Sequence, residues 1–265
     1  MDDLASLAEF AQRLADAARA ETLPRWREAG EARNKADDGS FNPVTDADVG
    51  SERAMRALIE AHFPDHGIVG EELGERASSG PWSWSLDPLD GTRAFVCGMP
   101  TWVTLIALLE HGQPVLGVID APRIGERYVG FGATAELYDH QGVHPLNVSG
   151  CAHLVDARLS TTDPYMFRDE EAEAFDRVRR SIRTARYGHD GYAYARLAAG
   201  SIDLVVESGL APHDINALVP VVRAAGGVIG NWEGDFDVSG GRIVAAASQE
   251  LYDEAVNLLR ETPQL

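Results

Sequence analysis

The sequence predicts an α+β fold, in which a partly antiparallel sheet packs against amphipathic helices. Four short apolar segments follow one another between residues 102 and 138, separated by turns that contain glycine, as strands joined by hairpins would be. Helical patterns precede this group of strands and resume after it. With 265 residues, the chain is long enough to bury a large core, either as one domain or as two fused sub-domains.

Two helices are expected before the first strand. Apolar residues recur at helical spacing over residues 4 to 28, whereas residues 34 to 43 are polar and should form a loop. A second helix should begin near Thr45 and end at Pro64, because proline cannot continue a helix. The short apolar run from Gly67 to Gly70 then predicts a buried strand.

Residues 82 to 95 predict a short strand, a rigid turn and the start of a helix. Pro88 fixes its own φ angle and restricts the residue before it. Gly91 permits a close approach of the backbone, and Thr92 suits the N-cap of the helix that follows.

Asp87 and Asp90 make this turn the most informative feature of the chain. They stand three residues apart, and two carboxylates on one turn can share a hard cation. A helix that begins after them would direct free N–H groups and its positive end to the same place, which suits a phosphate group. The turn therefore predicts a site for a metal ion together with a phosphate.

The rest of the chain divides into a strand-rich part and a mixed part. The central strands should cover residues 102–109, 114–120, 127–131 and 135–138. After a boundary near residues 148 to 155, we expect helices over 169–183, 192–199, 215–225 and 249–260, and strands over 202–207, 228–229 and 243–246. These patterns predict an N-terminal αβ unit, residues 1–150, and a C-terminal αβ unit, residues 151–265.

Gly130 to Ala135 imitates a dinucleotide-binding fingerprint. Its last position is alanine instead of glycine, and the residues after it have the pattern of another strand rather than a helix. We therefore expect a hairpin at this place and no nucleotide site.

Composition excludes several classes of protein. The 23 basic and 42 acidic residues give a net charge of −19, which would repel nucleic acid and an anionic membrane surface. The two cysteines, Cys97 and Cys151, lie far apart, which argues against a disulfide scaffold or a thiolate metal site. The N-terminus lacks the features of a secretory signal, and the central apolar run at residues 102 to 109 is far too short to span a bilayer. We expect a cytoplasmic protein.

Two further acids have informative surroundings. Glu71 comes directly after the apolar strand that ends at Gly70, which favours a ligand role over a place in an exposed loop. Asp214 precedes a buried helical pattern, where capping of the helix and binding of a metal both remain open.

Three motifs resemble a known family. Gly70-Glu71-Glu72, Asp87-Pro-Leu-Asp90-Gly-Thr92 and His213-Asp214-Ile-Asn-Ala-Leu are similar to the three signatures of the inositol monophosphatase superfamily of Mg²⁺-dependent phosphatases. Lys35 and Pro43-Val-Thr45-Asp-Ala-Asp48 resemble the segment that precedes them. The resemblance extends from about residue 10 to residue 260 and implies a layered αβαβα sandwich that acts as one compact catalytic domain.

The resemblance also implies a metal site built from both halves of the chain. Glu71, Asp87 and the Leu89 carbonyl would hold one Mg²⁺, and Asp87, Asp90 and Asp214 would hold a second. Whether a third Mg²⁺ joins during catalysis stays open. The family suggests a homodimer that acts on a small phosphate monoester.

The same resemblance implies roles in catalysis. The amides of Gly91 and Thr92 would bind phosphate, and Thr92 with Asp48 would orient and deprotonate the attacking water. Glu71 would belong to the catalytic set as well as to the metal site. No covalent phosphoenzyme is expected.

Three stretches resemble the histidinol-phosphate phosphatase branch more than the inositol branch. They are Asp90 to Trp102, in which Arg93 follows Thr92, Tyr187 to Tyr194, and Leu204 to Asp214. Histidinol phosphate bears an ammonium group and an imidazole, so acids in the C-terminal unit make chemical sense, and Asp190 and Glu207 are candidates beside Arg93. Structural hydrogen bonding is an equal alternative for the two acids.

Some positions depart from that branch. Gly191 stands where cysteine is common, Ala211 where lysine is common, and Asn231 where aspartate is common. None is an implied metal ligand, so hydrolysis would be intact while the substrate stays open. The alternatives are a phosphatase of inositol phosphates, or of a broader set of sugar and nucleotide phosphates, and a non-catalytic regulator that binds metal or phosphate.

Overall fold

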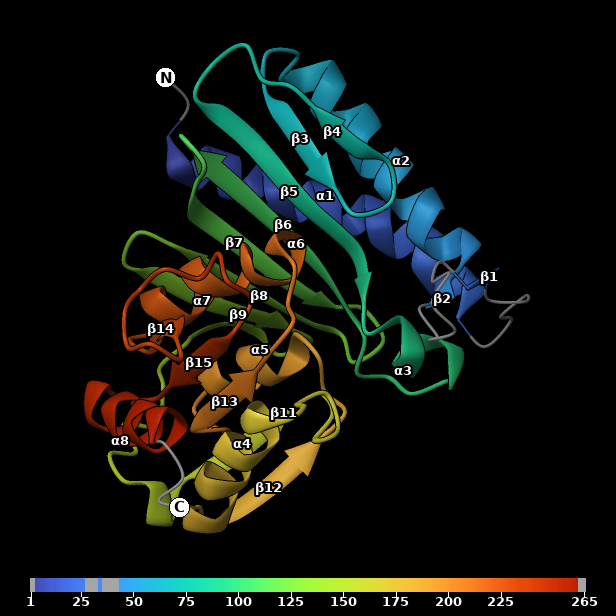
Figure 1. Cartoon of the computed structure of the whole chain (residues 1–265). Helices are drawn as coiled ribbons and strands as arrows, with labels where there is room; N and C mark the ends of the chain where they lie inside the picture. The colour runs from blue at the N-terminus through green and yellow to red at the C-terminus, as the bar shows by residue number, and fades with distance from the viewer. Residues whose placement is uncertain (1–2, 27–32, 35–42, 262–265) are drawn as a thin grey trace.

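Helices and sheets alternate in five layers in the computed structural model of the chain, which describes residues 3–26, 33–34 and 43–261 (Figure 1). Helices α1 (Leu4–Arg25) and α2 (Asp46–His62) cover the outer face of an eight-stranded sheet. Between this sheet and a five-stranded sheet lie α5 (Tyr192–Ala198) and α7 (Leu218–Ala224). Helices α4 (Glu170–Ser181) and α8 (Gln249–Arg260) cover the far face. The α+β class and the layered arrangement are thus confirmed.

The eight-stranded sheet is mostly antiparallel, as predicted. Its order is β10-β9-β8-β7-β6-β5-β3-β4, and among its described strands only β3 and β5 pair in parallel. The bounds are β3 Gly67–Gly70, β4 Gly74–Arg76, β5 Trp82–Asp90, β6 Val103–Glu110, β7 Gln113–Ala121, β8 Glu126–Phe131, β9 Thr134–Asp139 and β10 Gly142–Pro145.

The hairpin expected near Gly130 is present, because β8 and β9 pair antiparallel from Arg127 and Tyr138 to Phe131 and Thr134. Strands β4 and β10 were not predicted. Both are short edge strands whose residues are largely exposed, so they lack the alternation of apolar and polar residues that identifies a strand.

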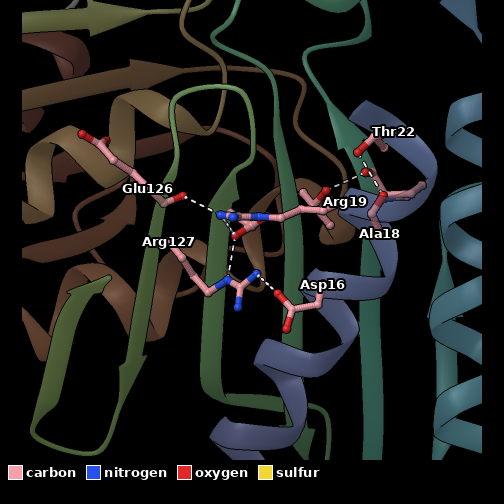
Figure 2. Close-up of polar contacts among 9 residues, drawn as sticks. Asp16, Ala18, Arg19, Thr22, Glu126 and Arg127 are labelled. Carbon is pink, nitrogen blue, oxygen red and sulfur yellow. Dashed lines mark hydrogen bonds and ion pairs between the residues drawn. The ribbon is translucent and has the colours of Figure 1, made fainter. Parts of the chain in front are cut away.

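Apolar packing and ion pairs fix helix α1 to the sheet, and Figure 2 draws the polar contacts. Arg19 on α1 donates two hydrogen bonds of 2.7 Å to the fully buried carboxylate of Asp120 on β7. Arg127 on β8 donates to the same carboxylate at 2.7 Å and reaches back to Asp16 on α1 at 2.6 Å. One buried acid therefore ties the first helix to the middle of the sheet. The predicted end of α1 was residue 28, but the helix ends at Arg25, and residues 27 and 28 lie outside the described residues.

The five-stranded sheet has the order β12-β11-β13-β15-β14. Its bounds are β11 Arg158–Thr161, β12 Thr184–Tyr187, β13 Leu204–Glu207, β14 Val228–Asn231 and β15 Ile243–Ala246. Strands β11 and β12 were not predicted, and β13 begins two residues later than expected.

The helix predicted over residues 215–225 is wrong in part. The chain forms a short helix α6, Pro212–Ile215, and then α7 after a turn at residues 216 and 217. Pro220 has no N–H to donate to the carbonyl four residues earlier, which removes the hydrogen bond that would carry one helix through the turn. The early start reflects Asp214, whose Oδ2 accepts the Ala211 amide at 2.7 Å.

Short pieces complete the described chain. Strands β1 (Arg33–Asn34) and β2 (Pro43–Val44) pair with each other, so the predicted loop over residues 34–43 contains strand residues at both described ends. Lys35, expected in the segment before the motifs, lies outside the described residues. No described helix is long and apolar enough to cross a membrane.

Candidate active site

A bulge in β5 brings Asp87 and Asp90 to one face of the sheet. Asp87 pairs with Leu105 on β6 and Asp90 pairs with Val103, so two residues of β5 between these pairs lie opposite one residue of its partner. On a regular strand, residues three apart point to opposite faces, and the extra residue reverses this. Pro88 can occupy the bulge because no ladder hydrogen bond is needed from it there.

Asp214 joins the two β5 acids from α6. Oxygen atoms of Asp87, Asp90 and Asp214 all lie within 4.8 Å of one another. Helix α6 is held against β5 by a hydrogen bond of 3.1 Å from Asn216 Nδ2 to Ser85 Oγ. Of the two roles left open from the sequence, capping is observed, since Asp214 Oδ2 accepts the Ala211 amide, while metal binding stays a prediction that the place of Asp214 in the acid cluster supports.

Burial and mutual repulsion make this cluster unfavourable as three anions. Burial raises the pKa of Asp87 and of Asp90 well above the usual range, and the charges of Glu71, Asp90 and Asp214 raise that of Asp87 further. Burial also raises the pKa of Asp214. A divalent cation would relieve the repulsion, and an all-oxygen donor set fits Mg²⁺.

Glu71 and Leu89 border the same cluster. Glu71 follows β3, and its backbone amide donates to the carbonyl of Leu86 on β5 at 3.2 Å. Its charge raises the pKa of both Asp87 and Asp48, so its carboxylate acts on this site. The Leu89 amide donates to Asp87 Oδ1 at 3.0 Å and so orients that carboxylate.

Thr92 lies between Leu89 and Asp48. Its Oγ is 3.0 Å from the Leu89 carbonyl and 3.3 Å from Asp48 Oδ1, and its single proton can serve one acceptor at a time. Asp48 is 1 % exposed and is held by the amide and the hydroxyl of Thr45, at 2.8 and 2.5 Å, in a capping box of α2. Burial raises the pKa of Asp48.

The prediction that Thr92 is the N-cap is wrong. Helix α3 (Thr92–Val96) has Gly91 at its N-cap, with φ of 84°, and Thr92 is its first residue. Gly91 adopts the left-handed conformation that favours glycine, and a β-carbon there would lie 2.9 Å from Asp190 Oδ2. The turn is therefore built around a close contact with the C-terminal half of the chain.

The substrate candidates Asp190 and Glu207 line one small cavity beside the acid cluster. Its volume is about 100 Å³, and Asp90 and Asp214 line it as well. Burial raises the pKa of Asp190 to about 6, against the lowering effect of the Arg93 guanidinium, and burial raises that of Glu207 to about 7. Arg93 itself is exposed at the start of α3.

Two neighbours of Glu207 were not identified from the sequence. Thr162 donates to Glu207 Oε1 from its amide at 2.8 Å and from its hydroxyl at 2.5 Å, and the Tyr194 hydroxyl donates to Oε2 at 3.0 Å. Thr162 follows β11, an unpredicted strand, so no signal marked it. Tyr194 stood in a stretch with family resemblance but had no assigned role.

Comparison with known proteins identifies the family. A model described as "Inositol monophosphatase family" matches residues 3–264. The chain is 36% identical to the histidinol-phosphatase of Mycobacterium tuberculosis, covering 83% of this chain and 85% of that protein. It is 30% identical to an inositol-1-monophosphatase of Synechocystis, covering 99% and 91%. An Arabidopsis thaliana protein named bifunctional phosphatase IMPL2, chloroplastic, is 40% identical over 84% of this chain and 67% of its own length.

Solved structures agree with the sequence comparisons. An inositol monophosphatase from Zymomonas mobilis superposes with a TM-score of 0.86 at 37% identity, covering 98% of this chain and all of that one. An inositol monophosphatase from Anabaena gives a TM-score of 0.84 at 27% identity, covering 99% and 98%. The chain therefore belongs to the inositol monophosphatase family, whose members are metal-dependent, and it is a phosphatase of phosphate monoesters.

Proposed function

We propose that this protein hydrolyses L-histidinol phosphate to L-histidinol and phosphate, as a step of histidine synthesis. The observation that carries the proposal is that Asp190, half-buried, and Glu207, buried, line the same cavity as Asp90 and Asp214. Histidinol carries an ammonium group and an imidazole, and carboxylates are the natural partners for both. The uncharged leaving group of inositol phosphate would gain much less from these acids.

The acid cluster fits two Mg²⁺ ions. Glu71, Asp87 and the Leu89 carbonyl would hold one ion, and Asp87, Asp90 and Asp214 the other. Bound Mg²⁺ would polarise the phosphoryl group and lower the pKa of a bound water. Residues 1–150 would thus supply most ligands, and residues 151–265 would supply Asp214 and the groups that read the substrate.

In this proposal, Thr92 and Asp48 handle the proton of the attacking water. The Thr92 hydroxyl lies 3.3 Å from Asp48 Oδ1, and a general base works best when its pKa is close to the operating pH, as burial favours for Asp48. The water oxygen forms the new bond to phosphorus and its proton passes to Asp48, while the phosphorus–oxygen ester bond breaks and the leaving oxygen, which keeps the electron pair, takes a proton from solvent water. The amides of Gly91 and Thr92 would hold the phosphate, and Glu71 would complete the catalytic set. Arg93, which is exposed, would bind the substrate.

The test is phosphate release with Mg²⁺ from four substrates, compared by kcat/KM. They are histidinol phosphate, inositol 1-phosphate, fructose 1,6-bisphosphate and adenosine 3′,5′-bisphosphate. We expect a preference of ~100-fold for histidinol phosphate, which corresponds to ~2.7 kcal/mol of transition-state discrimination. Similar rates on all four would favour a phosphatase of broad specificity. No release from any substrate would favour a non-catalytic regulator.

Asp87→Asn tests the proposed metal site, because it removes a carboxylate charge while it keeps the size of the side chain. An asparagine Oδ1 can still accept the Leu89 amide, so the fold should persist while Mg²⁺-dependent turnover is abolished. Glu75→Gln, at an exposed position of β4, removes one carboxylate outside the site and should leave turnover unchanged. Turnover retained in Asp87→Asn would contradict the proposed metal site.

The proposal also includes the oligomeric state and the location in the cell. The resemblance to the family supports a homodimer, which light scattering of the purified protein would measure. It also supports action in the cytoplasm, which fractionation of cells would check.

A further inference from the structure

A second pocket shares a loop with the catalytic cavity. It lies between α5 and the edge strand β12, and its volume is about 300 Å³. His189 lines this pocket, whereas the next residue, Asp190, lines the catalytic cavity. Adjacent residues of one loop therefore border two different cavities.

Three arginines give the pocket a positive character in a chain of net charge −19. Arg158 is neutralised by Asp203, which accepts from its Nε and Nη2 at 2.7 Å each. Arg196 donates to the hydroxyls of Tyr128 and Ser201 and lies 3.6 Å from Glu126.

Arg186 on β12 differs from the other two. It is exposed, and in the part of the chain that the structure describes no carboxylate forms an ion pair with it. Arg186 and His189 both line the pocket, and burial together with the charge of the Arg186 guanidinium lowers the pKa of His189. Among the described residues, the pocket thus has one guanidinium that is not in an ion pair with a carboxylate.

The remaining wall is mostly apolar. Leu159, Tyr192 and Ile202 line it, and Tyr192 is the aromatic residue among them. A pocket of this size is at the lower end of the range for small-molecule sites, about 300 to 1,000 Å³. Its chemistry is complementary to a small ligand that has a flat apolar body and a negative charge.

We propose that this pocket binds a small organic anion that carries one apolar ring, with Arg186 as its counter-ion. The proposed site is separate from phosphate hydrolysis. The catalytic cavity is lined by carboxylates and repels anions when no metal is present, so in metal-free protein the two sites can be distinguished.

The test uses benzenesulfonate, which has one ring and a charge that does not titrate near neutral pH. Isothermal titration calorimetry on metal-free protein in EDTA measures its affinity, and NMR detects a shift of the His189 ring signals. We expect saturable binding to the wild-type protein and at least tenfold weaker binding to Arg186→Ala. Because Arg186 is exposed, this variant should melt at the wild-type temperature.

Arg180→Ala is the matched control. Arg180 is an exposed arginine on α4 that pairs with Asp176, outside the pocket, and its loss should leave the affinity unchanged. Equal affinity of Arg186→Ala and wild type, or no binding to the wild type, would overturn the proposal. If inorganic sulfate bound as tightly as benzenesulfonate, the role of the apolar ring would be overturned.

Discussion

The backbone amide of Gly191 donates a hydrogen bond of 2.5 Å to Asp90 Oδ2, across 101 residues of chain. This contact links the start of α5 to the end of β5 and so joins the loop of Asp190 to the acid cluster. A β-carbon at Gly191 would lie 2.5 Å from the same oxygen, so Asp90 and residue 191 cannot keep their positions if the glycine is replaced.

Gly191→Ala should lower the stability of the metal-free protein while leaving most of the activity. The group that must move is the end of the Asp90 side chain, which can rotate, and the lost hydrogen bond should cost about 1 kcal/mol. With Mg²⁺ bound, Asp90 would be drawn toward the ion, so kcat/KM should stay within about threefold. Urea unfolding in EDTA and steady-state kinetics measure the two effects.

Gly80→Ala is the control for this change, because a β-carbon there meets no atom of the described residues within 4 Å. It should alter neither stability nor turnover. A loss of activity on the order of 10²-fold in Gly191→Ala would show instead that Asp90 keeps its hydrogen bond to Gly191 during catalysis.

Thr92→Val should reduce kcat by about 10²- to 10⁴-fold, the range for loss of proton transfer by a positioned group. Valine keeps the shape of threonine but removes the hydroxyl that lies 3.3 Å from Asp48 Oδ1. Thr92→Ser restores a hydroxyl and should recover most of kcat. Full activity in Thr92→Val, measured at saturating substrate and Mg²⁺, would show that this hydroxyl does not orient the water.

The acid cluster illustrates how far sequence alone reaches. The motif from Asp87 to Thr92 correctly indicated a strand followed by a helix start, but the rigid turn predicted to carry the two acids is wrong, because β5 continues through a bulge to Asp90 and only Gly91 separates it from α3. The spacing could not show that both acids face one side, because the bulge that aligns them depends on pairing with Val103 and Leu105 of β6. The approach of Asp214 likewise depends on how α6 packs against β5.

Three of the missed strands share a physical cause, whereas β11 lies inside its sheet and is largely buried. Strands β4, β10 and β12 are short and lie at sheet edges, where most side chains are exposed and apolar alternation is absent. The break between α6 and α7 follows from Pro220 and from the capping by Asp214. In the sequence, the long apolar run over these residues is a stronger signal for one continuous helix than these two features are for a break. Thr162 lines the cavity because it follows β11 and contacts Glu207. Since β11 was not predicted, Thr162 could not be placed from the sequence.

Asp120→Asn should destabilise the protein by about 3 to 5 kcal/mol, because two arginines would lose the buried charge that pairs with them. Arg127 is largely buried beside Asp120, so water cannot replace the lost partner easily. Asp176→Asn on α4 removes an exposed ion pair with Arg180 and should cost about 0.5 kcal/mol or less. Urea unfolding of both variants checks this, and equal losses would contradict the structural role of Asp120.

Glu207 should make the metal-free protein less stable as the pH rises from about 4.5 to about 7. Its pKa is raised from 4.5 to about 7 by burial, so the folded chain binds the proton more tightly than the unfolded chain does. The stabilisation is fully present below the unfolded pKa and is lost as the pH rises through the folded one. Over this window the loss should be about 1 to 3 kcal/mol.

Glu207→Gln tests this dependence. The amide oxygen can still accept from Thr162, whereas the group no longer titrates, so the free energy of unfolding should fall less steeply with pH than in the wild type. Urea unfolding in EDTA at pH 5 and pH 7.5 gives the two slopes, and Glu75→Gln, at an exposed position, should retain the wild-type slope. Parallel curves for wild type and Glu207→Gln would mean that Glu207 is already ionised in the folded protein at pH 5. The pH dependence would then have to arise in the cluster of Asp87, Asp90 and Asp214, where Mg²⁺ should abolish it.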